Sequence, residues 1–458
     1  MRYNIRHLLC SVSLLCGTLS SCTMLDSWFK VEPNVVVIFV DTVRADHVSL
    51  YGGEKQTTPN LDRYAKQGAY FSKAYSHSGW TLPSAISMFT GLYPHEHKVG
   101  RSPTSAQEFG SLPVDAVTLA ELFASKGYNT GAVINNTFLA PDFGLAQGFQ
   151  TYLYTGADNQ DIRSAKENTD LALNWWDTHT GTKFLLLHYM NPHMNLSPPA
   201  STLGQFSDTE IRDKHGIQIP FDLQQAFAIT QLSPEERASP ENIEKIQQIL
   251  ALYDEEILAV DMEIQRVVEH IGTSNVLYVF TSDHGEEFWE FNDFEHGHHL
   301  KSVLTNVPLV FWGEGVPNIG EVSGLVSHVD MFHTILAQAD IPIPENTHGI
   351  NILQTPIAHD SMVISENTLY GDPFVSVVSS QYRLEINQQS HMAALWKLDA
   401  TGREHQLLQD NLMDLSEPLF EYIRQVRGDI NPIEQVPGLK IPSQEAFQQL
   451  KKLGYIER

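Results

Sequence analysis

Three strongly apolar runs of the sequence end in side chains that could bind a metal ion. The runs cover residues 35–42, 183–193 and 275–285. Asp41 lies at the end of the first run and His193 at the end of the second. Asp283 and His284 lie at the end of the third. Because carboxylate and imidazole groups together suit a divalent metal with mixed oxygen and nitrogen ligands, the sequence indicates such a site.

The runs also indicate how these side chains are brought together. Each run is apolar without alternation, which is typical of a strand buried on both faces, in a parallel sheet between helices. Ligand sites of open α/β sheets gather beyond the carboxyl ends of such strands. We therefore expect an α/β fold in which the metal-binding side chains meet at one edge of the sheet.

Residues 78–91 supply a hydroxyl group that such a metal could activate. Thr81 stands at an N-cap position, Pro83 fits the first turn of a helix, and an apolar stretch follows. A helix N-terminus attracts anions through its unpaired N–H groups and its dipole. Thr81 is therefore a candidate nucleophile toward a phosphoryl or sulfuryl group. The alternative is that Thr81 is a helix cap and nothing more.

Six stretches of the chain occur in an order that matches one known family. They are residues 41–52, 57–75, 81–100, 191–199, 281–290 and 296–313. Taken together they resemble the sulfatase family of the alkaline phosphatase superfamily. The resemblance implies an alkaline-phosphatase-like three-layer sandwich, with a mostly parallel central sheet and a smaller C-terminal α+β subdomain. It also implies a metal-dependent hydrolase or transferase.

One position departs from the sulfatase pattern. True sulfatases begin the segment C/S-x-P-S-R with a cysteine or serine that is oxidised to formylglycine. Here that position is Thr81, and the arginine position is Ala85. The chain is therefore similar to relatives that keep threonine as a direct nucleophile, namely lipoteichoic acid synthases, phosphoethanolamine transferases and nucleotide phosphodiesterases. Those enzymes act on phosphorus and form a covalent phosphothreonine.

The resemblance implies a ligand set for one divalent metal ion. Asp41, Asp283 and His284 would hold the metal, and the Thr81 hydroxyl would take the fourth position. Three protein ligands and an open position are typical of a catalytic metal. Many sulfatases carry a second aspartate after the first, whereas Thr42 stands here. With one carboxylate fewer and a histidine present, we expect Mn²⁺ or Zn²⁺ rather than Ca²⁺.

The resemblance also implies roles for several polar side chains. His193 matches the histidine that contacts the substrate ester, and His298 aligns with a lysine or histidine near the leaving group. Either could donate a proton to the departing oxygen. His95 and His97 follow the nucleophile helix, where relatives place substrate contacts, and Asn135 is a further candidate for substrate binding. A plain structural role is the alternative for each. The sequence does not separate the roles of two neighbours, His296 and His299.

The first 22 residues are typical of a bacterial lipoprotein signal peptide. Arg2 and Arg6 precede a short apolar stretch, and residues 19–22 match a lipobox that ends at Cys22. We therefore expect a lipidated Cys22 that anchors the chain to the membrane on the periplasmic side of the cell envelope, with the outer membrane preferred. An ordinary signal peptide or an anchor helix is the alternative. Residues 23–33 are expected to form a short tether.

The rest of the chain divides into two expected parts. Residues 34–350 would form the catalytic domain, and residues 351–458 a subdomain with a small antiparallel sheet. Residues 200–235 show no clear period and are expected to be a long insertion over the mouth of the site. Helices are expected near residues 59–68, 116–127, 240–270 and 329–339, the last on the far side of the main domain.

Charge and composition narrow the function. The 29 basic and 55 acidic residues give a net charge of −26, which argues against nucleic acid or an anionic membrane surface as a partner. An anionic ester is the expected substrate, whether a glycan, a lipid head group or a small phosphoester. Three classes stay open: an ester hydrolase for phosphate or sulfate esters, an envelope phosphoryl-group transferase, and a non-catalytic binder of anionic glycans. We favour the hydrolase because such transferases usually carry several membrane-spanning helices, a pattern absent from this sequence.

Overall fold

A computed structural model gives the fold, and the apolar runs form its centre. The structure describes residues 32–105, 107–155, 162–399, 402–407, 412–433, 435–443, 447–448 and 450–451. In β1, alternate side chains enter two separate hydrophobic cores, with Val35 and Val37 in one and Val36 and Ile38 in the other. A strand covered on both faces needs apolar side chains at every position, so the unbroken run has a direct structural cause.

The central sheet has the order β11-β2-β10-β6-β1-β5-β3-β4, and β9 pairs with β2. β1 is parallel to both β5 and β6, whereas β10 is antiparallel to β2 and β6. The predicted α/β class with a mostly parallel sheet is therefore confirmed. The strands are β1 (Asn34–Val40), β2 (Ala69–Tyr75), β3 (Asn129–Ile134), β4 (Thr151–Tyr154), β5 (Lys183–Tyr189), β6 (Val276–Ser282), β9 (Asn306–Val307), β10 (Leu309–Gly313) and β11 (Gly320–Ser327).

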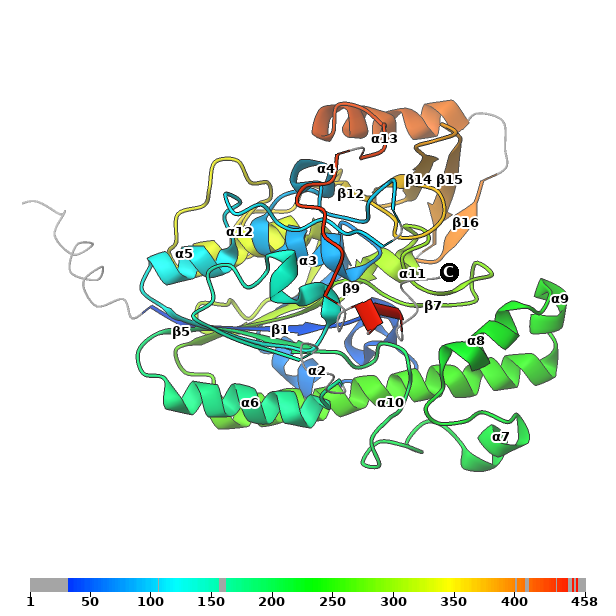
Figure 1. Cartoon of the computed structure of the whole chain (residues 1–458), viewed down its shortest axis with the longest axis horizontal. Coiled ribbons are helices and arrows are strands. Elements are labelled where there is room, and N and C mark those ends of the chain that lie inside the picture. The colour runs from blue at the N-terminus through cyan, green and yellow to red at the C-terminus, as the bar shows by residue number, and fades with distance from the viewer. Residues whose placement is uncertain are drawn as a thin grey trace, which may run out of the picture.

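Helices cover both faces of this sheet and make the three layers (Figure 1). One layer holds α3 (Thr81–Thr90), α5 (Leu119–Ser125) and α12 (His328–Gln338). The other holds α2 (Pro59–Ala65), α6 (Ala165–Thr178) and α10 (Pro240–Ile271). Every residue of α3 is buried, which fixes its N-terminus firmly against the sheet. Among the described residues, no helix is long and apolar enough to span a membrane.

A second sheet, separate from the first, follows in the C-terminal part. Its five antiparallel strands are β12 (Val363–Glu366), β13 (Phe374–Val378), β14 (Tyr382–Asn387), β15 (Ala393–Leu398) and β16 (Glu404–Gln406). α13 (Leu412–Val426) packs on this sheet (Figure 1). The expected antiparallel C-terminal sheet is confirmed, while the domain boundary at residue 350 stays a prediction.

One local expectation was wrong. α12 does not lie on the far side of the main domain, because His328 at its start lies beside Ser84 of α3. The insertion contains α7 (Thr209–Lys214), α8 (Leu223–Thr230) and α9 (Pro234–Arg237), and its place over the mouth of the site stays a prediction. These helices are too short to show a hydrophobic period. The Glu255 carboxylate of α10 holds the preceding loop by accepting backbone N–H bonds from Gly204 and Ser207.

The remaining elements are short and connect the larger ones. They are the 3₁₀ turns η2 (Ala45–His47), η3 (Ser49–Tyr51), η4 (Thr137–Leu139) and η5 (Pro141–Phe143), the helices α4 (Pro94–His97) and α11 (Ser302–Thr305), and the hairpin of β7 (Glu287–Phe288) with β8 (Phe294–Glu295). The β7–β8 hairpin follows directly on the segment that carries Asp283 and His284. The hairpin forms a separate two-stranded sheet beyond the carboxyl end of β6.

Candidate functional site

The register of two central strands places the predicted metal ligands side by side. β1 pairs with β6 so that Val40 lies opposite Ser282, the last residue of each strand. Asp41 and Asp283 come directly afterwards, so both carboxylates leave the same edge of the sheet. The prediction from the apolar runs, that these side chains meet, agrees with this register.

The atoms that face one another in this cluster lack other partners. Oδ1 of Asp41 and Oδ2 of Asp283 are buried and accept no hydrogen bond within the described structure. Nε2 of His284 lies 3.3 Å from Oδ2 of Asp283 and 3.9 Å from Oδ1 of Asp41. The three ligand atoms all lie within 4.8 Å of one another. Buried polar atoms without partners are rare, so their convergence fits a cation between them.

The tautomer of His284 also fits metal binding. Its Nδ1 lies 2.9 Å from the carbonyl oxygen of Gly285 and donates to it. Nε2 therefore carries the lone pair and faces the two carboxylates. Burial lowers the pKa of His284 to about 4, so the ring is neutral near pH 7. A neutral imidazole whose other nitrogen is held by a carbonyl group is the usual form of a histidine ligand.

The two buried carboxyl groups disfavour each other's ionisation, and a cation between them would remove this effect. Burial raises the pKa of Asp283 well above its ordinary value, and the nearby Asp41 carboxylate raises it further. Burial also works against ionisation of Asp41, but the hydrogen bond from His188 and three nearby histidines outweigh it and lower its pKa. Two carboxylates that share a buried site cannot both ionise without positive charge. The residues present therefore fit a divalent metal ion.

Thr81 lies against this cluster from the opposite side. Its Oγ1 is 3.3 Å from Nε2 of His284, and the residue is fully buried. The N-cap expectation was wrong by one residue, because Trp80 is extended and caps α3 while Thr81 is its first helical residue. This shift matters chemically, since the Thr81 hydroxyl faces the cluster rather than a backbone N–H. Pro83 does lie in the first turn, as expected.

Two side chains that the sequence did not single out hold Asp41 in place. Nδ2 of Asn136 donates to Oδ2 of Asp41 at 2.5 Å. Nε2 of His188, on β5, lies 3.4 Å from the same oxygen. Asn136 thus occupies Oδ2 and His188 lies beside it, while Oδ1 is left for a metal. Only their positions in the sequence could have identified them. His188 lies near the carboxyl end of β5, which neighbours β1, and Asn136 follows β3, which neighbours β5.

Two histidines complete the surroundings of His284. The ring of His296 lies 4.3 Å from that of His284 and 5.1 Å from that of His193. Nδ1 of His296 lies 2.9 Å from Oε1 of the buried Glu286, and Nδ1 of His193 lies 2.7 Å from the carbonyl oxygen of Met194. The structure therefore brings His193 to the cluster, as predicted, and adds His296.

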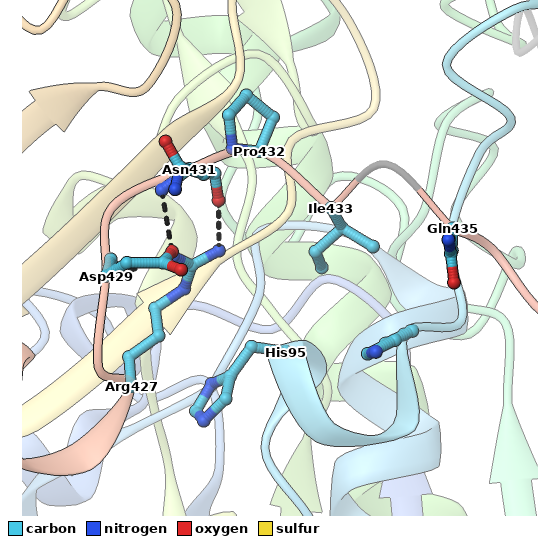
Figure 2. Close-up of a pocket in the computed structure, with 8 residues that line it drawn as sticks. His95, Arg427, Asp429, Asn431, Pro432, Ile433 and Gln435 are labelled. Carbon is cyan, nitrogen blue, oxygen red and sulfur yellow. Dashed lines mark hydrogen bonds and ion pairs between the residues drawn. The ribbon is translucent and has the colours of Figure 1, made fainter.

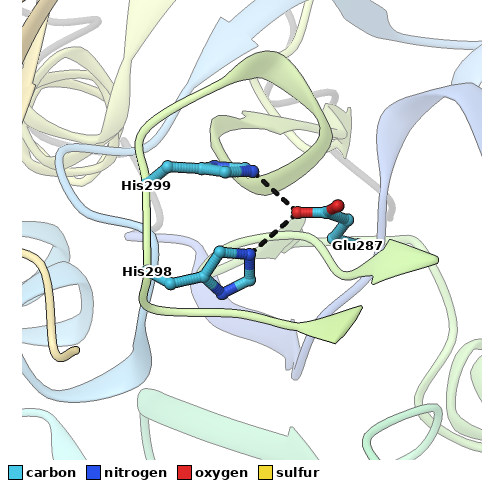
Figure 3. Close-up of side chains that lie close together, drawn as sticks. All are labelled: Glu287, His298 and His299. Carbon is cyan, nitrogen blue, oxygen red and sulfur yellow. Dashed lines mark hydrogen bonds and ion pairs between the residues drawn. The ribbon is translucent and has the colours of Figure 1, made fainter. Parts of the chain in front are cut away.

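His298 points elsewhere. Figure 3 shows His298 and His299 with both rings turned toward Glu287, and each Nε2 lies 2.8 Å from Oε2 of that carboxylate. No contact joins His298 to Thr81 or His284 in the part of the chain that the structure describes. The proton-donor role of His298 stays a prediction without geometric support, and His296 is the better placed of the two.

The two histidines that follow α3 make structural contacts. Nδ1 of His95 lies 2.5 Å from Glu366 of the C-terminal sheet, and Nε2 of His97 lies 3.1 Å from the Ser87 hydroxyl. His95 also lines a pocket of about 380 Å³ that lies against the segment after α13 (Figure 2). The residues that line it are His95, Lys98, Arg427, Asp429, Asn431, Pro432, Ile433 and Gln435. The predicted substrate contacts of His95 and His97 stay predictions, because no contact joins either ring to Thr81 among the described residues.

The side chain of Asn135 also makes structural hydrogen bonds. Its Nδ2 donates to the carbonyl oxygen of Arg163, and its Oδ1 accepts from Thr155 and from the backbone of Arg163. The residue is 2% exposed. With its amide groups occupied, Asn135 fixes the loop after β3, and its neighbour Asn136 is the residue that reaches the metal cluster.

The Arg44 side chain connects the loop after Asp41 to residues 286–290. The Arg44 side chain is buried, makes two hydrogen bonds to Asp46 and one to Glu290, and donates to the carbonyl oxygen of Glu286. Thr42, which directly follows Asp41 in the same loop, has a φ of 55°. A positive φ is costly for a β-branched residue and occurs mainly at functional sites. The surroundings therefore hold the backbone beside Asp41 in a fixed conformation.

Comparison with known proteins decides the family. A model of the family described as Sulfatase matches residues 33–341, which is most of the chain. The chain belongs to the sulfatase family. One curated relative is N-acetylgalactosamine-6-O-sulfatase of Bacteroides thetaiotaomicron, which is 35% identical over 103 residues, or 22% of this chain and 20% of that protein. The aligned segment is thus about a fifth of that sulfatase.

Solved structures agree with the sulfatase fold. One is described as a complex with its substrate D-glucosamine-2-N,6-O-disulfate; it is 19% identical, has a TM-score of 0.71, and covers 88% of this chain and 100% of its own. Another is a phosphonate monoester hydrolase from Silicibacter pomeroyi, with 18% identity, a TM-score of 0.66, and coverage of 86% and 96%. At the level of the family, the expectation of an ester hydrolase is confirmed.

Proposed function

We propose that this protein hydrolyses phosphate or phosphonate esters with Thr81 as its nucleophile and one divalent metal ion as its cofactor. The proposal is carried by the Thr81 hydroxyl, which lies 3.3 Å from Nε2 of His284 in a cluster whose two free carboxylate oxygens face it. Zn²⁺ or Mn²⁺ is favoured because a histidine belongs to the ligand set. When bound, the metal would lower the pKa of the Thr81 hydroxyl and polarise a non-bridging substrate oxygen.

The chain's own residues supply the remaining chemistry. The Thr81 oxygen attacks phosphorus while its proton passes to a neighbouring imidazole, the bond from phosphorus to the leaving oxygen breaks, and a phosphothreonine forms. The leaving oxygen takes a proton from an imidazole, for which His193 and His296 are the nearest candidates. Water then cleaves the phosphothreonine and restores the hydroxyl. Burial of the whole cluster excludes bulk water and strengthens each of these interactions.

The choice of phosphorus over sulfur follows from the nucleophile. A formylglycine hydrate can expel sulfate by forming an aldehyde, whereas a sulfothreonine has no such route. The phosphonate monoester hydrolase among the structural neighbours supports phosphorus chemistry on this fold. The disulfated glucosamine bound by another neighbour supports an anionic ester of a glycan as the kind of substrate. We therefore place a glycan or a lipid head group that carries a phosphoryl ester first.

An activity panel tests the proposal. Purified protein is assayed with an aryl sulfate, an aryl phosphate monoester, a diester and a phosphonate, each with Zn²⁺, Mn²⁺ or Ca²⁺. We expect the phosphorus esters to turn over faster than the sulfate. Thr81→Ala should lower turnover by roughly three or more orders of magnitude. Thr90→Ala is the matched control, because Thr90 is also buried in α3 but its hydroxyl bonds to the carbonyl oxygen of Ile86.

Two further readouts separate the alternatives. Peptide mass mapping should find unmodified Thr81 at rest and phosphothreonine when a slow substrate is trapped. Release of free phosphate or phosphonate indicates hydrolysis, whereas appearance of the group on an added alcohol indicates a transferase. A wild-type protein that cleaves only sulfate esters, or a Thr81→Ala variant with near-normal turnover, would overturn the proposal.

A further inference from the structure

A second group of metal-ligand side chains lies outside the catalytic cluster. Glu287 comes from β7, and His298 and His299 come from the loop after β8. The three ligand atoms lie within 4.8 Å of one another, and none of these residues belongs to the Asp41, Asp283 and His284 set. We call them the Glu287 cluster. Figure 3 shows both imidazoles converging on one carboxylate oxygen.

Backbone hydrogen bonds fix the orientation of the Glu287 carboxylate. Its Oε1 accepts backbone N–H bonds from Phe291 at 2.7 Å and from Asp293 at 3.0 Å. Oε2 is thereby turned toward the two Nε2 atoms, each 2.8 Å away. Neighbouring ligands around a tetrahedral zinc ion lie roughly 3.3–3.6 Å apart, given bond lengths of about 2.0–2.2 Å. The carboxylate–histidine separations of 2.8 Å are shorter, so the two rings would move outward slightly to admit a metal ion.

Among the described residues, one ring nitrogen of the Glu287 cluster has no other partner. Nδ1 of His298 is buried without a hydrogen-bond partner in the described structure, so it can carry the proton when Nε2 binds a metal.

Metal binding would break one hydrogen bond of the Glu287 cluster. Nδ1 of His299 accepts the backbone N–H of Lys301 at 3.3 Å, which places the ring proton on Nε2. A metal on Nε2 shifts that proton to Nδ1 and breaks this bond. The bond is long and therefore weak, so its loss is small beside two nitrogen ligands and one charged oxygen ligand.

We propose that the Glu287 cluster binds a second divalent cation, Zn²⁺ by preference, in addition to the catalytic metal. A carboxylate with two imidazoles is a typical zinc set, and it leaves a fourth position open. The site would join β7 to the loop after β8. That loop also carries His296, whose ring lies 4.3 Å from His284. The role of the second metal ion is thus to hold His296 in position beside the catalytic cluster.

Metal stoichiometry tests the proposal without any assay of turnover. The full chain is stripped with a chelator, equilibrated with zinc, passed through a desalting column and analysed by elemental mass spectrometry. We expect about two ions per wild-type chain, one in Asp283→Asn, one in Glu287→Gln, and none in the double variant. His359→Ala is the control for surface binding, because His359 is exposed, and it should keep both ions. One ion in wild type that Asp283→Asn removes would overturn the second site.

Diffraction settles the matter if Glu287→Gln does not fold. Crystals of the wild-type protein grown with zinc are measured above and below the zinc absorption edge. An anomalous peak within about 2.2 Å of Oε2 of Glu287 and of both Nε2 atoms supports the proposal. A peak at the Asp41, Asp283 and His284 cluster with none at the Glu287 cluster overturns it. The catalytic peak is read separately, so failure of the proposed function and failure of the second site are distinguishable.

Discussion

The two carboxylate oxygens of Asp41 have different surroundings. Oδ2 is occupied by Asn136 and lies near His188, and Oδ1 is left without a partner beside His284. A carboxylate held at one oxygen keeps the other aimed at a fixed point, which favours metal binding through reduced loss of side-chain freedom. Asn136 and His188 are therefore positioning residues, since they act through Asp41 and not on a substrate.

We predict that Asn136→Leu weakens metal binding at the proposed site of Asp41, Asp283 and His284. The substitution removes the donor to Oδ2 of Asp41 and lets the carboxylate rotate. Loss of such a partner typically lowers metal affinity by about 10- to 100-fold. Competition with a chromogenic chelator measures this affinity directly. Asn60→Leu is the matched control, because Asn60 also donates to a buried aspartate, Asp261, away from the site.

An unchanged metal affinity in Asn136→Leu would contradict this assignment of Asn136. A fall in affinity of equal size in Asn60→Leu would contradict it too, because the effect would then be a general loss of stability. Urea unfolding of each variant, stripped of metal, separates these cases.

At the scale of elements, α10 supports the segment that carries His193. Glu256 of α10 accepts the backbone N–H of Ser197 at 2.7 Å and a hydrogen bond from the side chain of Asn191. These residues lie on either side of His193, so one helix position fixes both ends of the loop. Burial raises the pKa of Glu256 to about 7, from an ordinary 4.5, despite these hydrogen bonds.

This raised pKa predicts a pH dependence of stability. The folded state holds the Glu256 proton more tightly than the unfolded state, so the stabilising contribution is complete below pH 4.5 and is lost as pH rises through about 7. We expect the wild-type protein to lose about 2–3 kcal/mol of unfolding free energy over this range relative to Glu256→Gln. Urea unfolding at a series of pH values measures the difference. Parallel pH profiles for the two proteins would refute the prediction.

At the scale of the whole molecule, one buried arginine joins the C-terminal sheet to the segment between β8 and β9. Arg383 of β14 is fully buried and pairs with Glu404 of β16 at 2.6 Å. It also donates to the carbonyl oxygen of Leu300 and to the hydroxyls of Ser302 and Thr305. The segment that it reaches lies directly after His299. The C-terminal sheet therefore supports the loop that carries His296 and the Glu287 cluster.

We predict that Arg383→Met destabilises the whole fold. The change leaves Glu404 buried without its partner and leaves several oxygens without a donor. Breaking a buried ion pair from one side typically costs about 3–5 kcal/mol. Chemical unfolding measures the loss, and Arg403→Met is the control because Arg403 is exposed and directly precedes β16. Equal stability of the two variants would contradict the role given to Arg383.

The expected lipid anchor falls on residues outside the part of the chain that the structure describes. We keep it as a proposal, motivated by the lipobox that ends at Cys22. Mass spectrometry of the mature N-terminus from a bacterial membrane fraction should find an acylated Cys22. Cys22→Ser should move the protein from the membrane fraction to the soluble fraction. An unmodified terminus downstream of Cys22 in the wild type would argue against the anchor and the envelope location.

Much of the fold was predictable from local pattern. The unbroken apolar runs fixed β1, β5 and β6 as central strands, because a strand covered on both faces needs apolar side chains at every position. Asp41 and Asp283 follow two of these strands directly, so parallel pairing alone brings them together. The long helix near residues 240–270 was predictable for a similar reason, since its hydrophobic period extends over many turns.

Only the tertiary structure decided which loop residues reach the site. His296 and His298 are two positions apart, yet one lies against His284 and the other turns toward Glu287. Asn135 and Asn136 diverge in the same way, and only Asn136 reaches Asp41. A loop has no fixed period, so side-chain direction depends on backbone turns and on distant partners. The sequence therefore determined the candidate metal ligands that directly follow regular strands, and three-dimensional packing determined the residues around them.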